Sequence, residues 1–413
     1  MKRYESYKPS GISWIGEIPS HWEVKRLGAF LARFNSDSGD TNIKIGLENI
    51  TSWTGKFIKT DTIYDGKGSY FEKGDILYGK LRPYLAKTWV AEFNGQAVGD
   101  FYVLRCKNSS YNHFVKLLLL NKQLVYLLDS FTYGAKMPRV SWNDMSRVYI
   151  PYPPLDEQKK IVEYLSTKTS LIDAQQSARE KEIRLLEELK QAEIANVVTR
   201  GLNPDVPMKK AKTLLGEEIP FSWQLIRNRN ILREENILVG NRKDLPLLSL
   251  TKSGIILRDI ESGKGKFTKD FEKYKEVIPG NIVFCLFDID ETPRNVGLSS
   301  HRGMITGAYD VFSINNDIID SRYLYHYFIA VDNIKALRPY YTGLRKVVQM
   351  ASFLGIQIPM PPLEEQRAIV EFIEQKNKAI DDMIANLRAE IDFLTEYKQR
   401  LIADAVTGQI KID

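Results

Sequence analysis

The chain contains one long motif twice, and this repeat limits its possible folds more than any other feature. Residues 150–163 read IPYPPLDEQKKIVE, and residues 358–371 read IPMPPLEEQRAIVE, at an offset of 208 residues. The match continues to VVT at 197–199 and AVT at 405–407, with about half of the positions identical. A duplication of this length predicts two copies of one structural unit, each ending in a long helix.

Each copy begins well before its helix. The first opens with GEIPSHW (16–22) and the second with GEEIPFSW (216–223). Short β-rich segments with glycine turns follow in both copies. They are IKIGLENI (43–50), DILYGKL (75–81) and QAVGDFYVLRC (96–106), and then DLPLLSLT (244–251), NIVFCLF (281–287) and ITGAYDVFSI (305–314). One helix is expected after them in each copy, near 111–129 and 320–337.

These patterns predict an α+β fold with two mixed α/β domains in tandem, each followed by a long helix. We place the domains at 1–152 and 201–360, and the helices at 153–200 and 361–410. Each helix opens on two prolines followed by carboxylates, which suit the first turn and the positive end of the helix dipole. A helix of about 44 residues is roughly 66 Å long at 1.5 Å per residue.

The second helix carries a heptad seam, and the first carries a less regular one. Lys398 interrupts the second seam, whereas Gln176, Arg179 and Lys190 interrupt the first. Two such helices can bury their seams together, either parallel or antiparallel. The alternative is a helical hairpin or a dimerisation rod with no further role. The expected seam residues are Ile172, Ile183 and Leu186, and Ile380, Ile384, Leu387, Ile391, Leu394 and Leu401.

Charge and composition narrow the class of protein. The net charge is +6, and it is concentrated outside the helices, with +7 over 1–154 and +4 over 201–362. Such an excess favours a polyanionic partner. The sequence shows no apolar run long enough to span a bilayer and no secretion signal, so no membrane contact is expected. The two cysteines, Cys106 and Cys285, fit buried reduced thiols and a cytoplasmic protein.

The usual catalytic motifs are missing from the sequence. The four histidines are scattered without metal-ligand spacing, so no metal site is expected. GKGS (66–69) and SGKGKF (262–267) lack the phosphate-loop frame and are interpreted as turns. YPP (152–154) lacks the acidic or amide residue of an adenine methyltransferase motif. We therefore expect a chain that binds and does not catalyse, with no cofactor of its own.

Basic and polar residues gather in comparable loops of both copies. GKLRPYLAKTW (79–89) and YGAKMPRVSWND (133–144) mix cations with aromatics, and TGLRKVVQMAS (342–352) corresponds to the second of them. DETPRNVGLSSHR (290–302) replaces GKLRPY with different chemistry. Such groups contact phosphates and base edges in DNA. The candidate DNA contacts are Lys80, Arg82, Tyr84, Lys87, Lys136, Arg139 and Ser141, and Arg294, Asn295, His301, Arg302, Arg345, Lys346 and Gln349.

The whole chain resembles a known family. Its openings, the junction VVTRGLNPDVPMK (197–209), the doubled PPLxEQ helices and the ending AVTGQIKID (405–413) are similar to the specificity (S) subunits of type I restriction-modification enzymes. The resemblance implies two target recognition domains that each read half of a split, asymmetric site in double-stranded DNA. It implies an antiparallel coiled coil that sets the spacing between the half-sites.

The resemblance also implies partners. Two methyltransferase (M) subunits would dock on the helices and adjoining surfaces, and restriction (R) subunits would join them. S-adenosylmethionine, ATP and Mg²⁺ would then belong to these partners. The alternative from the residues alone is a coiled-coil scaffold that joins two protein-binding modules without sequence-specific DNA binding.

Overall fold

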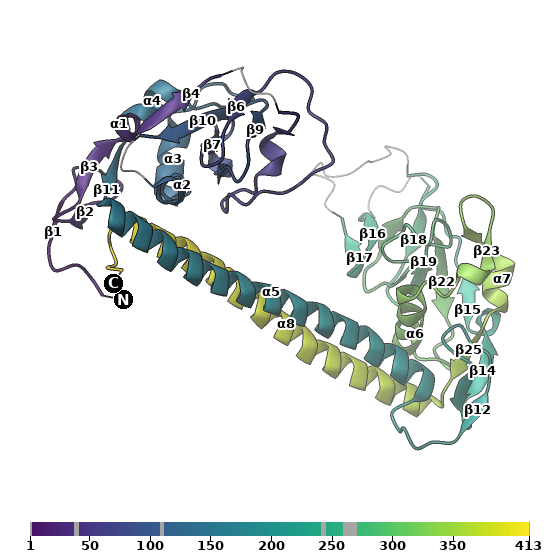
Figure 1. Ribbon diagram of the computed structural model, residues 1–413. Coiled ribbons are helices and arrows are strands. Elements are labelled where there is room, and N and C mark those ends of the chain that lie inside the picture. The colour runs from purple at the N-terminus through teal and green to yellow at the C-terminus, as the bar shows by residue number, and fades with distance from the viewer. Residues whose placement is uncertain (1, 37–40, 108–110, 241–244, 259–270, 413) are drawn as a thin grey trace. The chain divides into compact units, whose positions relative to one another are not determined.

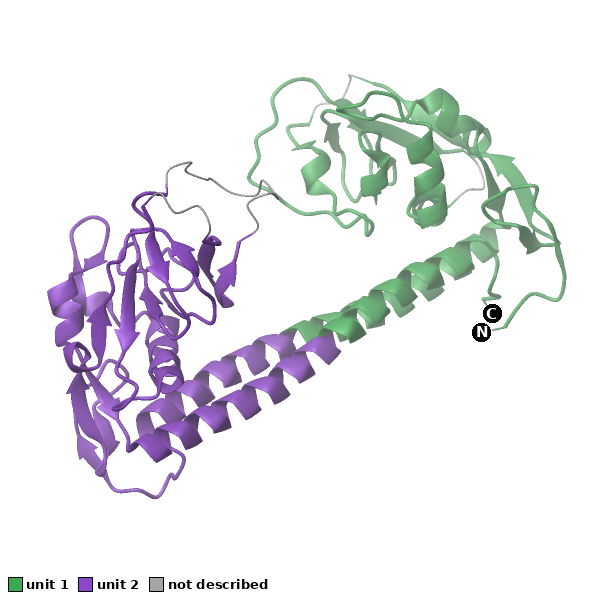
Figure 2. Ribbon diagram, turned by 180° about the vertical axis from the view of Figure 1, so that it is seen from behind, with its two compact units in different colours: residues 1–180, 388–413 green, residues 181–387 purple. Residues whose placement is uncertain are grey.

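The computed structural model describes residues 2–36, 41–107, 111–240, 245–258 and 271–412. The chain divides into two compact units (Figure 2). Unit 1 comprises residues 1–180 and 388–413, and unit 2 comprises residues 181–387. The division cuts through both long helices, so each unit contains part of each. The domain boundaries expected from the sequence stay predictions.

Unit 1 is built on a four-stranded antiparallel sheet. Its order is β4 (Leu31–Phe34), β10 (Phe101–Cys106), β7 (Ile76–Gly79) and β8 (Thr88–Val90). A smaller sheet contains β5 (Lys44–Ile45), β9 (Gly95–Ala97) and β6 (Ser69–Phe71). Helices α2 (Asn112–Leu119) and α3 (Lys122–Ser130) share one apolar core with the larger sheet, because their buried faces carry Phe114, Leu118, Leu124 and Leu128.

Unit 2 repeats this sheet with the same strand order. The strands are β15 (Leu232–Glu234), β22 (Asp310–Ile314), β19 (Ile282–Phe284) and β20 (Val296–Leu298), and helix α6 (Ser321–Asn333) packs in their core. Two antiparallel pairs stand beside the sheet: β16 (Leu248–Thr251) with β17 (Gly254–Leu257), and β18 (Lys275–Val277) with β21 (Gly303–Ile305). Gly74 and Gly280, at φ +95° and +90°, turn the chain into β7 and β19.

A second set of strand pairs is also repeated in both units. In unit 1, β1 (Tyr7–Pro9) pairs with β2 (Glu17–Pro19), and β3 (Glu23–Arg26) pairs with β11 (Tyr149–Tyr152). In unit 2, β12 (Met208–Lys210) pairs with β13 (Glu218–Pro220), and β14 (Gln224–Arg227) pairs with β25 (Gln357–Met360). Short helices α1 (Leu27–Phe30), α4 (Trp142–Arg147) and α7 (Met350–Gly355) complete these regions.

Two expectations about local structure were wrong in detail. The single helix expected near 111–129 is two helices, because the Asn121 side chain accepts hydrogen bonds from the Gln123 and Leu124 amides at 3.0 and 3.2 Å and starts α3 anew. IKIGLENI forms only the two-residue β5 and then a 3₁₀ turn (Leu47–Asn49), because Asn49 accepts a bond from the Gly46 amide. Residues 262–267 and Asp244 lie outside the described residues.

The long helices are α5 (Leu155–Arg200) and α8 (Leu363–Val406), and they pair antiparallel (Figure 1). Asp173 meets Lys398 and Gln176 meets Thr395 in unit 1, whereas Lys190 meets Asp381 in unit 2. The number on one helix therefore falls as the number on the other rises. Ile172, Ile380, Ile384 and Leu401 are buried and the other expected seam residues are half-buried, so the predicted fold class with an antiparallel coiled coil is confirmed.

The polar residues that interrupt the seams bond across the coiled coil. Gln176 donates to the Thr395 hydroxyl at 2.7 Å, and Arg179 forms an ion pair with Glu390 at 3.0 Å. Lys190 meets Asp381 at 2.7 Å, and Lys398 meets Asp173. These last two ion pairs are copies of each other, because Asp173 and Asp381, like Lys190 and Lys398, are 208 residues apart.

The repeated motifs meet at one junction in each unit. The indole N–H of Trp22 donates to the Glu157 carboxylate at 2.8 Å, and that of Trp223 donates to Glu365 at 3.1 Å. Both tryptophans are fully buried. Each tryptophan packs against the glycine that follows the end of a long helix. Trp22 packs against Gly408 after α8, and Trp223 packs against Gly201 after α5. The duplicated sequence thus encodes the contact between opening segment, helix start and helix end.

Both chain ends belong to the junction of unit 1 (Figure 1). The Lys411 amide donates to the Lys2 carbonyl at 2.9 Å, and the Tyr7 hydroxyl donates to the Gly408 carbonyl at 3.1 Å. No helix in the described part of the chain is long and apolar enough to cross a membrane.

Candidate nucleic-acid interface

In each unit, two loops meet at one edge of the sheet. We call them the strand loop, which follows β7 or β19 (80–87 and 285–295), and the hairpin loop, which precedes α4 or α7 (133–140 and 341–348). In unit 1 the Val140 amide donates to the Lys80 carbonyl at 3.1 Å. In unit 2 the Val348 amide donates to the Leu286 carbonyl at 2.8 Å. The two bonds join equivalent positions of the repeat.

A second pair of backbone bonds strengthens the equivalence. The Arg82 amide donates to Pro138 at 2.8 Å, and the Asp288 amide donates to Arg345 at 2.9 Å. Both donor residues adopt the uncommon left-handed backbone conformation, with φ +50° for Arg82 and +46° for Asp288. The two units therefore present different side chains, here a cation and an anion, from the same backbone frame.

In unit 1, several predicted contact residues hold the loops in place. The Arg139 guanidinium makes two hydrogen bonds to Asp100, at 2.8 and 2.9 Å, and Lys80 lies 3.7 Å from the same carboxylate. The bond from Arg139 holds the pKa of Asp100 below its usual value. Lys87 donates to the Leu47 carbonyl at 2.6 Å, and burial lowers its pKa. The two parallel hydrogen bonds from Arg139 to Asp100 fix the position of the hairpin loop.

Other residues of the same loops point into solvent. Arg82 and Lys136 are exposed and have no side-chain hydrogen bond or ion pair within the described ranges. Tyr84 is 41% exposed, and Tyr133 and Met137 on the hairpin loop are 61% and 47% exposed. Two unpaired cations among exposed aromatic and apolar groups provide what DNA recognition requires, namely charge for phosphates and flat or apolar surface for sugars and bases.

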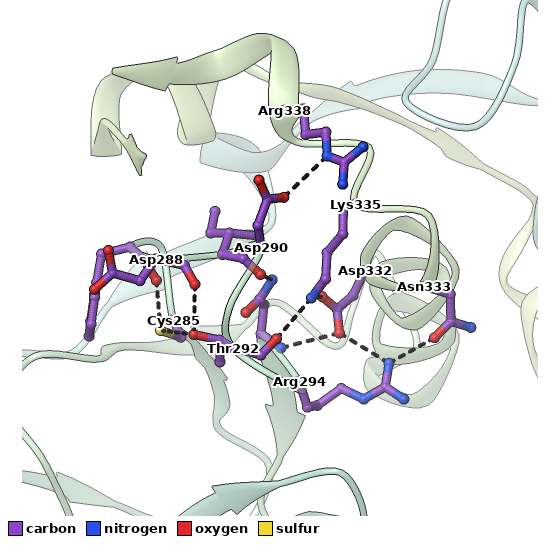
Figure 3. A network of polar contacts seen from close by, with 12 residues as sticks. Cys285, Asp288, Asp290, Thr292, Arg294, Asp332, Asn333, Lys335 and Arg338 are labelled. Atoms are coloured by element: carbon purple, nitrogen blue, oxygen red, sulfur yellow. Dashed lines mark hydrogen bonds and ion pairs between the residues drawn. The ribbon is translucent and has the colours of Figure 1, made fainter. Parts of the chain in front are cut away.

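In unit 2, the strand loop is bonded to the C-terminal end of α6 (Figure 3). Arg294 donates to Asp332 at 3.1 Å and to Asn333 at 2.9 Å, and its side chain is only 18% exposed. Asn295 is 3% exposed, and its amide donates to Asp332. Lys335 donates to the Thr292 carbonyl at 3.0 Å. Arg294 and Asn295, both predicted DNA contacts, therefore support the loop from within.

Asp290 ties the strand loop of unit 2 to its hairpin loop. Lys346 at 3.0 Å, Arg338 at 3.1 Å and the Tyr341 hydroxyl at 3.1 Å all donate to its carboxylate. The bond from Lys346 is the largest cause of a pKa near 2 for Asp290. Arg345 similarly meets Asp288 at 3.0 Å, with its side chain 70% exposed. Exposed ion pairs such as that of Arg345 are weak, and contact of Arg345 and Lys346 with DNA stays a prediction.

Four other predicted contacts have local roles or surface positions. Ser141 caps α4 by accepting a bond from the Asp144 amide at 3.1 Å. The exposed Gln349 donates to Thr342 at 3.2 Å, and the exposed Arg302 pairs with Glu276 at 2.9 Å. His301 is half-buried, and its backbone closes a turn on Ser299. Contact of any of these residues with DNA stays a prediction.

Sequence reasoning missed exposed apolar residues at this edge and on the helices. Tyr133, Met137 and Leu344 lie on the hairpin loops, and Leu344 is 104% exposed. On the coiled coil, four of the exposed large apolar side chains outside the seam form pairs at the repeat offset of 208 residues. They are Leu185, Leu189, Phe393 and Tyr397. These four residues could have been found from the sequence, because they are apolar residues outside the heptad positions that recur 208 residues apart. The described residues contain no group of three or more His, Cys, Asp or Glu side chains placed to hold a metal.

Comparison with known proteins identifies the family. A family model described as "Type I restriction modification DNA specificity domain" matches residues 19–185 and 266–392, more than half of the chain. The putative MjaX specificity subunit of Methanocaldococcus jannaschii, a type I restriction enzyme subunit, is 26% identical over 96% of both chains. The EcoDI specificity subunit of Escherichia coli is 31% identical over 36% of this chain and 35% of its own.

Solved structures show the same fold. A chain from work on complex assembly and conformational transition of the type I R-M system matches with a TM-score of 0.72 at 18% identity, over 95% of this chain and 99% of that one. The HsdS subunit from Thermoanaerobacter tengcongensis matches with a TM-score of 0.54 at 19% identity, over 95% and 98%. With these matches, the duplicated junctions and the paired helices, the chain belongs to the type I restriction-modification DNA specificity family.

Proposed function

We propose that this chain is the DNA sequence-recognition subunit of a type I restriction-modification complex, and that each unit reads one half of a bipartite, asymmetric site. The shared backbone frame with different side chains carries this proposal. Arg82 in unit 1 and Asp288 in unit 2 occupy equivalent left-handed positions, but one offers a cation and the other a carboxylate. Two units with one frame and unlike side chains are suited to two different half-sites in double-stranded DNA.

As a specificity subunit, the chain selects the site and its partners carry out the chemistry. Methylation of adenine in the selected site would use S-adenosylmethionine bound by methyltransferase subunits. Cleavage would use ATP and Mg²⁺ in restriction subunits. The complex would work in the cytoplasm, where it meets cellular and incoming DNA.

The helix surface supports two copies of one methyltransferase partner. Leu185 and Leu189 are 55% and 47% exposed, and Phe393 and Tyr397 are 70% and 47% exposed. The second pair lies 208 residues after the first, so it is the same patch in the other copy of the repeat. Exposed apolar patches of this kind mark protein contacts. A duplicated patch fits a partner that binds twice.

Methylome sequencing of cells with and without this chain tests the function. A split adenine-methylated motif should disappear on deletion and return on complementation. Replacing residues 1–152 with the corresponding segment of another family member should then change one half-site and leave the other intact. A protein-binding scaffold without DNA recognition predicts instead that no motif depends on the chain. A motif that persists in the deletion strain would reject the recognition role.

A further inference from the structure

The most exposed large apolar side chain among the described residues is Leu344, at 104%. It lies at the tip of the unit 2 hairpin loop, between β23 (Tyr341–Thr342) and β24 (Val347–Val348). A leucine is usually withdrawn from water, because its burial is favourable. Single exposed leucines are common on protein surfaces, but this one lies at the tip of the loop that carries the candidate DNA contacts Arg345 and Lys346.

The hairpin holds this side chain outward on a defined framework. The Thr342 hydroxyl donates to the Val347 carbonyl at 2.9 Å and accepts a bond from Gln349 at 3.2 Å. Gly343 and Lys346 make the tight turn, with φ +67° and +49°. Asp290 holds Tyr341 and Lys346, one at each side of the tip. The exposure of Leu344 is thus a feature of the fold.

The surroundings of Leu344 favour DNA over protein as its partner. The two residues that follow it, Arg345 and Lys346, are cations with side chains 70% and 46% exposed. Cations beside an apolar tip suit a groove in which phosphates flank stacked bases. Leucine, methionine and phenylalanine are the residues that architectural DNA-binding proteins insert between base pairs, partly unstacking them and kinking the duplex.

The equivalent hairpin loop of unit 1 has a related tip. Met137 is 47% exposed and follows the exposed, unpaired Lys136. Both loops turn through a left-handed glycine, Gly134 at φ +94° and Gly343 at +67°. The unit 1 loop is closed by a single bridge from Tyr133 to Arg139, whereas the unit 2 loop is closed by the two residue pairs of β23 and β24. The apolar tip thus occurs in both copies, and it is most prominent in unit 2.

We propose that Leu344 is a wedge that enters the groove of the unit 2 half-site and inserts at one base-pair step, with Arg345 and Lys346 on the adjacent phosphates. This proposal rests on the proposed function and adds to it a specificity-determining residue. A wedge favours steps that unstack easily, namely TA and CA/TG. Part of the unit 2 half-site would accordingly be recognised through the deformability of one step.

The test uses the full chain in complex with its methyltransferase subunits and a duplex that carries the methylated motif. 2-Aminopurine placed at successive steps of the unit 2 half-site reports unstacking, and end-labelled duplexes report bending by energy transfer. The wild-type complex should bend the duplex and raise 2-aminopurine fluorescence at one step away from the methylated adenine, because the methyltransferase itself takes that adenine out of the stack. Leu344→Ala should abolish both signals and weaken binding by about 10- to 100-fold, as expected for a buried leucine side chain that is lost. Leu344→Met should retain them.

Leu238→Ala is the matched control, because Leu238 is an aliphatic residue of the same unit and is 55% exposed. It should bind and bend DNA like the wild type. A wild-type complex that methylates the split motif without bending or unstacking it would overturn the wedge and leave the proposed function standing. Loss of methyltransferase subunits from the Leu344→Ala complex, measured by mass photometry, would show a protein contact and also overturn it. If no split motif depends on the chain, both proposals fail.

Discussion

Replacing Gly408 with alanine is expected to destabilise unit 1 strongly. Gly408 has φ +75°, a conformation that costs a residue with a side chain about 1–2 kcal/mol. A Cβ atom there would collide with Pro19, lying 2.8 Å from its Cγ, and would lie 3.1 Å from Trp22 Cη2. Neither ring can yield easily, because one is a proline and the other is fully buried. Such overpacking costs about 1–3 kcal/mol, so the total loss is about 2–5 kcal/mol.

Gly16→Ala provides the control for this experiment. Gly16 has φ +79°, but a Cβ atom there would meet nothing within 4 Å. Only the backbone cost of about 1–2 kcal/mol then remains. Urea unfolding followed by tryptophan fluorescence gives both losses, because the buried Trp22 belongs to the affected junction. The two variants should differ by about 1–3 kcal/mol.

Equal losses for Gly408→Ala and Gly16→Ala would refute the reasoning. They would mean that the junction of Pro19 and Trp22 accommodates an added methyl group. Gly201→Ala offers a check in unit 2, where the Cβ would lie 2.8 Å from Glu365 Oε1 and 3.3 Å from Trp223 Cζ2. A carboxylate at the end of a flexible side chain can move aside. The loss at Gly201 should therefore be smaller than the loss at Gly408.

Three further predictions concern the ion pairs and the helices. Asp290 has a folded pKa near 2, below the ordinary value of 3.8, so its stabilising effect is present above about pH 4 and is lost as pH falls toward 2. Asp290→Asn should thus lower the urea midpoint clearly at pH 7 and much less at pH 2, because the effect disappears only as pH falls through the folded pKa. Lys398→Met should lower the free energy of unfolding in urea by about 1–3 kcal/mol, because the Lys398 side chain is only 18% exposed. Lys190→Met removes the more exposed copy of this ion pair and should cost at most about 1 kcal/mol. Equal losses for the two variants would contradict this reasoning. Inserting seven residues at equivalent points of α5 and α8 should lengthen the unread spacer of the motif by about 10 Å, or about three base pairs, with both half-sites unchanged in methylome sequencing.

The sequence predicted the repeated framework because the framework lies in repeated residues. The two copies have matching tryptophans, Trp22 and Trp223, and matching glutamates, Glu157 and Glu365. A structure predicted for one junction therefore applies to the other. The heptad pattern likewise predicted a coiled coil. It left the direction of pairing open, because direction depends on which polar residues meet, as Lys190 and Asp381 do.

The candidate interface was only partly predictable. Arg139 and Lys136 lie three residues apart and read alike in the sequence, but Arg139 binds Asp100, which comes from a distant segment, and Lys136 has no partner in the described chain. Arg294 is paired in the same way by Asp332 on α6. A cation's role thus depends on a carboxylate far along the chain. Composition also could not reveal Leu344, because nothing local distinguishes an exposed leucine from a core leucine.

The division of the chain also has a consequence for its synthesis. Unit 2 consists of the single continuous segment 181–387, whereas unit 1 needs residues 388–413 to complete its core, with Leu401, Ala405 and Val406 buried there. A ribosome makes the chain from the N-terminus at about 5–20 residues per second. Residues 1–180 of unit 1 are therefore incomplete, with Trp22 lacking the end of α8, until residues 388–413 emerge. Unit 2 can fold as a whole before unit 1, which is encoded first and completed last.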